Sequence, residues 1–155
     1  MPKTKRKENR MKVIFFQGTF DGINAGHCRA IQELKKKYPQ SRLVMGLNAD
    51  SLVGWMIGAG KKSQKRLVLP FAQRKEILWS IKGVDEVIEC HEPSALRYLQ
   101  ELKADVYVLT KEWQAAQKEA IEWITAQKGE IVFSPRYPDI YCNSDIRRRI
   151  VEGEK

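Results

Sequence analysis

The chain has 155 residues and a formal net charge of +9, and its 43% of hydrophobic residues are enough for one domain with its own core. It has no apolar run long enough to span a bilayer and no secretory signal, so we expect a cytoplasmic protein with no membrane partner. The cysteines, Cys28, Cys90 and Cys142, are scattered without metal-ligand spacing, which fits a reducing compartment better than a disulfide framework.

The first segment, residues 1–10, is basic and polar, with five Lys or Arg residues against Glu8. We expect a disordered extension here and a single domain over residues 11–155. A basic tail can bind nucleic acid, but it is more often solvated, so we expect no nucleic-acid partner. The positive charge on the rest of the chain suits a protein that handles polyphosphates.

The next stretch predicts a strand, a glycine-containing turn and a helix. Val13–Phe16 is an apolar run typical of a strand buried on both faces. Gly18 and Gly22 interrupt it, and apolar residues then recur at helical spacing over residues 25–37. The backbone N–H groups of such a turn and the start of the helix can bind a phosphate. His27 can face that phosphate, although similar turns in other α/β proteins bind no ligand.

Four more stretches, at residues 42–47, 84–88, 105–109 and 130–133, are predicted to form strands. Helical patterns lie between and after them, over residues 70–81, over 92–103, up to about 127, and after 144. Strands that alternate with helices, without a hairpin signal, predict a Rossmann-like three-layer α/β/α fold with a five-stranded parallel sheet. Right-handed crossovers bring the loops after the strands to one edge, where ligands bind in such sheets.

Residues 53–66 are expected to form a loop, because Gly54, Gly58 and Gly60 punctuate them and basic residues follow. Glycines give mobility and lysines give charge, so this loop can close over phosphates. The alternative is an ordinary solvated loop.

The turn also carries a recognisable pattern. Gly18-Thr19-Phe20-Asp21, followed by Gly26-His27, resembles the signature G-[TS]-F-D-x-x-H-x-G-H of the nucleotidyltransferase superfamily whose hallmark is His-x-Gly-His. The chain departs from this signature at Asn24, where the first histidine is usual.

Further blocks extend the resemblance over residues 11–150. The string L-P-F-A-Q-R-K-E-I-L-W-S-I-K-G-V-D-E-V-I, which contains Arg74 and Lys82, is similar to a conserved family pattern, and V-M-G-L-N-A-D places Asp50 at a family aspartate. The segment from Pro135 to Arg147 resembles the second signature, P-R-T-E-G-I-S-T-T-x-I-R. The chain looks most like the small cytidylyltransferases of the glycerol-3-phosphate type. It is similar also to the adenylyltransferase part of heptose-nucleotide synthases.

The resemblance implies nucleotidyl transfer: a CMP or AMP group moves from CTP or ATP to a small phosphorylated polyol or sugar, and pyrophosphate is released. It implies Mg²⁺ bound mainly through the nucleotide, and a homodimer; we see no protein metal site. The catalytic residues implied are His27, Asn24, Arg74 and, from the basic loop, Lys62. The nucleotide-binding residues implied are Gly18, Thr19, Phe20, Asp21, Gly26, His27, Arg136, Cys142, Asn143 and Ser144. The substrate-binding residues implied are Asp50, Lys82, Glu112 and Trp113.

Alternatives stay open at this point. Overall likeness favours CTP, with ATP and a sugar phosphate as the other pairing. Asparagine at position 24 can donate only a neutral hydrogen bond, so the chain could also be a nucleotide-binding protein that has lost catalysis. Ser144 could simply cap the last helix, with Arg147–Arg149 as a solvated face.

Overall fold

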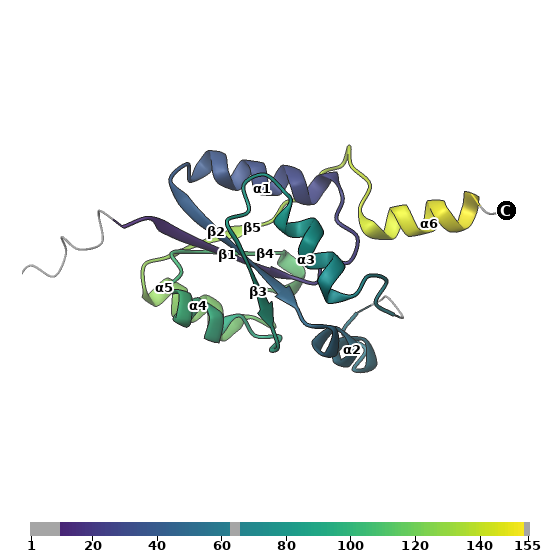
Figure 1. The fold of residues 1–155 in the computed structure, drawn as a ribbon. Helices are drawn as coiled ribbons and strands as arrows, with labels where there is room; N and C mark the ends of the chain where they lie inside the picture. The colour runs from purple at the N-terminus through teal and green to yellow at the C-terminus, as the bar shows by residue number, and fades with distance from the viewer. Residues whose placement is uncertain (1–9, 63–65, 154–155) are drawn as a thin grey trace, which may run out of the picture.

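The computed structural model describes residues 10–62 and 66–153. Within them, one parallel sheet has the strand order β3-β2-β1-β4-β5 (Figure 1). The strands are β1 (Lys12–Gly18), β2 (Ser41–Asn48), β3 (Glu86–Cys90), β4 (Val106–Leu109) and β5 (Glu130–Phe133). The predicted five-stranded parallel sheet is therefore confirmed, and the apolar run of β1 lies at its centre.

Helices cover both faces of the sheet, as the three-layer prediction requires. They are α1 (Ala25–Lys37), α2 (Asp50–Gly58), α3 (Phe71–Trp79), α4 (Leu96–Leu102), α5 (Lys118–Ala126) and α6 (Asn143–Gly153), with a 3₁₀ turn η1 (Lys111–Trp113). Successive residues of β1 point to opposite faces. Ile14 packs with Ile31 of α1 and Leu78 of α3 in one core cluster, while Phe15 packs with Leu99 of α4 in the other.

The prediction of a loop over residues 53–66 is wrong in its first part, because Asp50–Gly58 form helix α2. Gly54 and Gly58 lie on an open side of this helix, where an added Cβ would meet nothing within 4 Å. Leu52 and Met56 face the other way and are buried. Burial of these apolar side chains outweighs the low helix propensity of glycine, which is worth only about 1 kcal/mol per residue.

The strand register brings one set of loops together. β1 pairs with β2 from Lys12 opposite Ser41 to Gly18 opposite Leu47, and β4 lies along the other side of β1. All strands run in parallel, so the turns that follow β1, β4 and β5 lie at one edge of the sheet. The candidate site lies at this edge.

The two ends of the described chain differ in their contacts. Residues 1–9 of the predicted extension lie outside the described residues, while Arg10 forms an ion pair of 2.8 Å with Asp105. Helix α6 reaches away from the sheet and has no buried residue (Figure 1). Within the described ranges, no helix combines the length and the apolar character needed to cross a membrane.

Candidate active site

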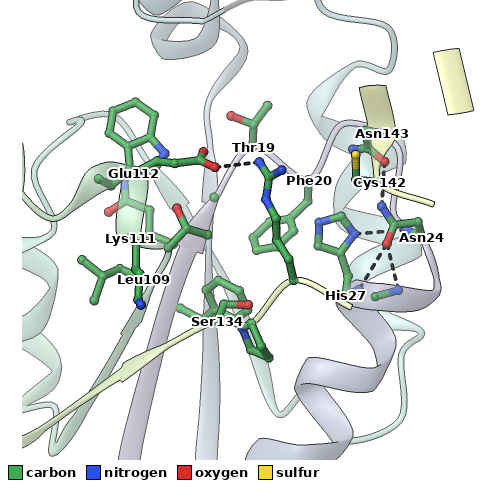
Figure 2. A pocket seen from close by; sticks show the side chains of 18 of the residues that line it. Thr19, Phe20, Asn24, His27, Leu109, Lys111, Glu112, Ser134, Cys142 and Asn143 are labelled. Atoms are coloured by element: carbon green, nitrogen blue, oxygen red, sulfur yellow. Dashed lines mark hydrogen bonds and ion pairs between the residues drawn. The ribbon is translucent and has the colours of Figure 1, made fainter. Parts of the chain in front are cut away.

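A cavity of about 1020 Å³ lies at the carboxyl ends of β1, β4 and β5. Its wall is made by the β1–α1 turn, by the segment that follows β4 and by the segment between β5 and α6 (Figure 2). Lys62 also lines it. Of the predicted site residues, it is lined by Gly18, Thr19, Phe20, Asp21, Asn24, Gly26, His27, Lys62, Glu112, Trp113, Arg136, Cys142 and Asn143. The structure thus brings together blocks that are more than 100 residues apart in the sequence.

The β1–α1 turn is shaped by Phe20, which has a positive φ of 49° and a buried side chain. Its ring packs edge-on against Phe16, at 5.4 Å between centroids, and against His27, at 5.6 Å. A Cβ at Gly18 would stand 2.9 Å from the Phe20 ring, so only glycine fits there. Gly22 has a φ of +95°, which favours glycine. The turn therefore needs these residue types to fold back over the end of β1.

Asn24 caps helix α1. Its side-chain oxygen accepts hydrogen bonds from the backbone N–H groups of Gly26 (2.8 Å) and His27 (3.4 Å). The backbone N–H of Asn24 in turn donates to Nδ1 of His27 at 3.1 Å, which completes a capping box. The asparagine at the unusual position of the family signature thus has a clear local role at the start of α1.

The same contact fixes the protonation of His27. Since Nδ1 accepts a hydrogen bond, the neutral ring carries its proton on Nε2. Burial lowers the pKa of His27 below its ordinary value, because the imidazolium would lose hydration. At neutral pH the cavity wall therefore presents a neutral N–H donor at this point.

The start of α6 forms a second part of the wall. Asn143 is the first residue of the helix, and its side-chain oxygen accepts a hydrogen bond from the Asn24 amide at 2.9 Å (Figure 2). Cys142 precedes it; its thiol and its backbone N–H both donate to the carboxylate of Asp145, at 3.0 and 3.1 Å. These two hydrogen bonds lower the pKa of Asp145 below its usual value. Ser144 is exposed and does not line the cavity.

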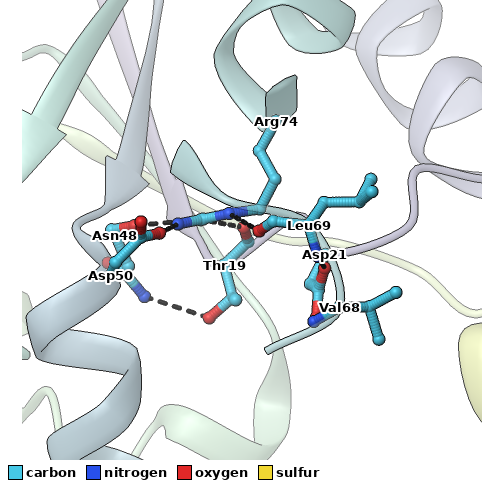
Figure 3. A network of polar contacts seen from close by, with 7 residues as sticks. All are labelled: Thr19, Asp21, Asn48, Asp50, Val68, Leu69 and Arg74. Carbon is cyan, nitrogen blue, oxygen red and sulfur yellow. Dashed lines mark hydrogen bonds and ion pairs between the residues drawn. The ribbon is translucent and has the colours of Figure 1, made fainter. Parts of the chain in front are cut away.

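Asp21 binds the backbone of the segment just before α3. Its carboxylate accepts hydrogen bonds from the backbone N–H groups of Val68 and Leu69, each at 2.8 Å (Figure 3). Lys62 itself lines the cavity. Burial lowers the pKa of Lys62, nearby Arg147 acts in the same direction, and Asp21 partly opposes the shift. A bound anion beside Lys62, which is predicted to be catalytic, would favour the protonated amine and so oppose this lowering of its pKa.

Arg74 is fully buried and does not line the cavity. Figure 3 shows its guanidinium at the centre of a polar network. The group donates to the carbonyl oxygens of Leu69 (3.0 Å), Thr19 (2.7 Å) and Asn48 (2.9 Å), and to the carboxylate of Asp50 (2.6 Å). These bonds join the ends of β1 and β2 to the segment before α3.

Two further predicted residues lie elsewhere. Asp50 is bound to Arg74 at the start of α2 and does not line the cavity. Lys82 lies in the turn before β3, at the amino edge of the sheet, where its carbonyl oxygen accepts a hydrogen bond from Gln32 of α1. A residue just before a parallel strand lies at the edge opposite the one where ligands bind. The structure therefore does not bring Arg74, Asp50 or Lys82 into the cavity.

The segments after β4 and β5 form the remaining wall. Glu112 and Arg136 are exposed and form an ion pair of 2.7 Å across the cavity. Trp113 lines the cavity and packs against the cluster of Leu52 and Met56. This side of the cavity thus combines an exposed ion pair with an apolar surface.

Sequence reasoning missed Gln17 and Thr110, which also line the cavity. The Gln17 amide donates to the side-chain oxygen of Asn48 (3.0 Å) and to the carbonyl of Glu92 (2.9 Å). In the described part of the chain, Oε1 of Gln17 and Oγ1 of Thr110 are buried without a hydrogen-bond partner. Both are polar residues that directly follow an apolar strand run, a signal that could have identified them.

Comparison with known proteins agrees with this geometry. A family model described as cytidylyltransferase-like matches residues 15–147. The bifunctional protein HldE of Nitrobacter hamburgensis is 27% identical over 126 residues, which are 81% of this chain and 24% of that protein. HldE of Geobacter metallireducens is 33% identical over 102 residues, which are 66% of this chain and 19% of that protein. The chain thus spans about a quarter or less of the length of these relatives.

A solved structure has the same fold. The lipopolysaccharide core biosynthesis protein from Thermoplasma volcanium GSS1 superposes with a TM-score of 0.65 at 23% sequence identity, over 83% of this chain and 99% of that one. The family model covers most of the chain, and both blocks that meet in the cavity, residues 18–27 and 136–147, fall within it. The chain therefore belongs to the cytidylyltransferase-like family of nucleotidyltransferases.

Proposed function

We propose that this domain transfers a CMP or AMP group from a nucleoside triphosphate to the phosphate of a small sugar or polyol. An oxygen of the acceptor phosphate attacks the α-phosphorus, a new P–O bond forms, and the bond to the bridging oxygen of the β-phosphate breaks. Pyrophosphate leaves with the electron pair of that bond. The acceptor phosphate is already an anion, so no general base is needed.

The observation that carries this proposal is the meeting of His27 and Asn143 in one cavity with Lys62. His27 offers Nε2–H near the start of α1, and Asn143 marks the start of α6 on the same wall. Backbone N–H groups at the start of α6 and the positive dipole ends of both helices favour phosphate oxygens. Preorganised donors and cations of this kind stabilise the charge that builds up on the α- and β-phosphates.

Mg²⁺ would be held mainly through the phosphates of the nucleotide, where it would offset part of their negative charge. Among the described residues, no group of three or more His, Cys, Asp and Glu side chains is placed to hold a metal. Lys62 supplies protein charge beside the metal-bound triphosphate, and Arg136 does so once it leaves Glu112.

The choice of nucleotide and acceptor rests on likeness. The matched family is cytidylyltransferase-like, which favours CTP. Similarity to HldE agrees with the resemblance to the adenylyltransferase part of heptose-nucleotide synthases, which favours ATP and a sugar phosphate. Both pairings use the same cavity and the same bond changes.

Pyrophosphate release tests the proposal. CTP and ATP, each with Mg²⁺, are combined with glycerol 3-phosphate and with a panel of sugar phosphates. We expect release that needs one nucleotide and one acceptor, that is lost in His27→Ala and that is retained in His91→Ala, a histidine that is exposed and outside the cavity. If no pair gives release while a triphosphate still raises the melting temperature, the domain is a binding protein that has lost the reaction.

A further inference from the structure

Two asparagine side chains join the β1–α1 turn to the start of α6. Nδ2 of Asn24 donates to Oδ1 of Asn143 at 2.9 Å, across 119 residues of sequence (Figure 2). The oxygen of the Asn24 amide caps α1, so both polar atoms of this side chain are engaged. To contact a phosphate through Nδ2, the amide would compete with the bond to Asn143.

The amide nitrogen of Asn143 also contacts the β1–α1 turn. Its Nδ2 donates to the backbone carbonyl of Asp21 at 3.3 Å. A Cβ at Gly22 would lie 3.7 Å from the Asn143 amide, so this amide lies beside the turn. Asn143 thus contacts the turn both through Asn24 and through the backbone of Asp21.

This contact matters because α6 buries no side chain that could hold its start in place. The helix has no buried residue among Asn143–Gly153. The segment before it is tied to α1 at exposed points, by the ion pair of Arg29 with Asp139 (3.0 Å) and by the hydrogen bond of Tyr137 to Glu33 (2.6 Å). Exposed pairs of this kind contribute little, commonly under about 1 kcal/mol. The part-buried amide pair directly links the first residue of α6 to the β1–α1 turn, and so contributes to where the first N–H groups of α6 lie relative to the cavity.

We propose that Asn24 and Asn143 form an amide clasp that fixes the start of α6 against the β1–α1 turn, so that Asn24 is a positioning residue for nucleotide binding. This inference rests on the proposed function for the identity of the ligand. The clasp is uncharged, so it holds α6 in the same way across the neutral pH range. Asn24 then acts through α6, whereas His27 faces the phosphate directly.

A double-mutant cycle tests the clasp. Asn24→Ser keeps a residue that caps helices well but is too short to reach Asn143, and Asn143→Ala removes the other half. We expect each substitution to raise about tenfold the Kd of the protein for the nucleoside triphosphate, measured with Mg²⁺ present. The Kd of the double variant should be no higher than that of either single variant. In turnover assays KM should rise by a similar factor while kcat changes little. Additive effects, or a fall in kcat at constant KM, would overturn the proposal.

Hydrogen exchange supplies a readout that needs no activity. Amides of residues 146–149, the first that donate helical hydrogen bonds at the start of α6, should exchange about tenfold faster in Asn24→Ser and in Asn143→Ala, as expected for an opening made easier by one lost hydrogen bond. Gln32→Ala is the matched control, because it removes an amide hydrogen bond from the same helix at the opposite edge of the sheet. Unchanged exchange at α6 would reject the clasp, whereas absence of turnover with normal nucleotide binding would reject only the proposed reaction.

Discussion

Nδ1 of His27 lies 3.1 Å from the backbone nitrogen of Asn24, three residues earlier in the chain. This contact leaves Nε2 to carry the ring proton, and the edge of the Phe20 ring limits how the imidazole can turn. The backbone thus selects the tautomer of the residue that we expect to contact the nucleotide. A second proton would have to go on Nδ1 and would break the hydrogen bond, which agrees with a lowered pKa.

The stability of the protein should therefore depend on pH through His27. Its pKa in the folded state lies below the ordinary value of 6.5, so the unfolded chain binds the proton more readily. The contribution of the neutral ring is present above pH 6.5 and is lost as pH falls through the lowered pKa. We expect the melting temperature of the wild type to fall, relative to that of His27→Gln, between pH 7 and pH 5. Parallel melting curves for the two proteins would contradict this expectation.

Arg74 gives a prediction of a different kind, because its contacts are structural. Arg74→Lys keeps the charge but cannot reproduce the planar fork that binds several carbonyl oxygens at once. Carbonyl groups of Thr19, Asn48 and Leu69 would lose partners in a buried place. We expect a loss of about 2–4 kcal/mol in the free energy of unfolding, measured by urea denaturation. Full stability combined with lost turnover would show instead that the arginine acts on substrate, as its place in the family pattern first suggested.

The fold was predictable because its signals are local. The runs Val13–Phe16 and 131–133 are short and apolar, each is followed within two residues by Gly or Pro, and each lies in a strand of the sheet. Helix α2 was missed because its glycines indicate a loop, while its stability comes from burial of Leu52 and Met56 against Trp113. Leu52 and Met56 have the i, i+4 spacing of a helix, but two such positions in a segment of nine residues are a weak signal beside Gly54 and Gly58.

The site was predictable only where it is contiguous. The turn from Gly18 to His27 lies within ten residues, and the structure places it in the cavity. The bond from Asn24 to Asn143 depends on where two loops meet and on which way two amides point, and neither follows from spacing. Lys82 shows the converse: the family likeness placed it at the substrate, but its position before β3 puts it at the amino edge of the sheet.

Asp21 should affect nucleotide binding through the segment that it holds. Asp21→Asn leaves one acceptor oxygen for the two N–H groups of Val68 and Leu69, so one of them loses its partner. We expect a loss of about 1–3 kcal/mol in stability together with a raised KM for the nucleotide. Asp85→Asn is the matched control, because this carboxylate also accepts a backbone N–H, from Leu43, but lies far from the cavity. It should lower the melting temperature and leave KM unchanged; a raised KM in both variants would show a general loss of structure.

Two adjacent lysines allow a test of whether a specific contact with phosphate or only the positive charge of the segment supports the reaction. Lys62 lines the cavity, whereas Lys61 is exposed and stacks over the ring of Trp55 at 5.2 Å. Lys62→Met should lower kcat/KM about a hundredfold or more, because a cation is removed from beside the charge of the transition state. Lys61→Met removes the same charge and should change kcat/KM less than about threefold. Since burial lowers the pKa of Lys62, wild-type activity should also fall at alkaline pH as this amine loses its proton. Equal effects of the two substitutions would mean that the net charge of the segment, and not the placement of Lys62, supports the reaction.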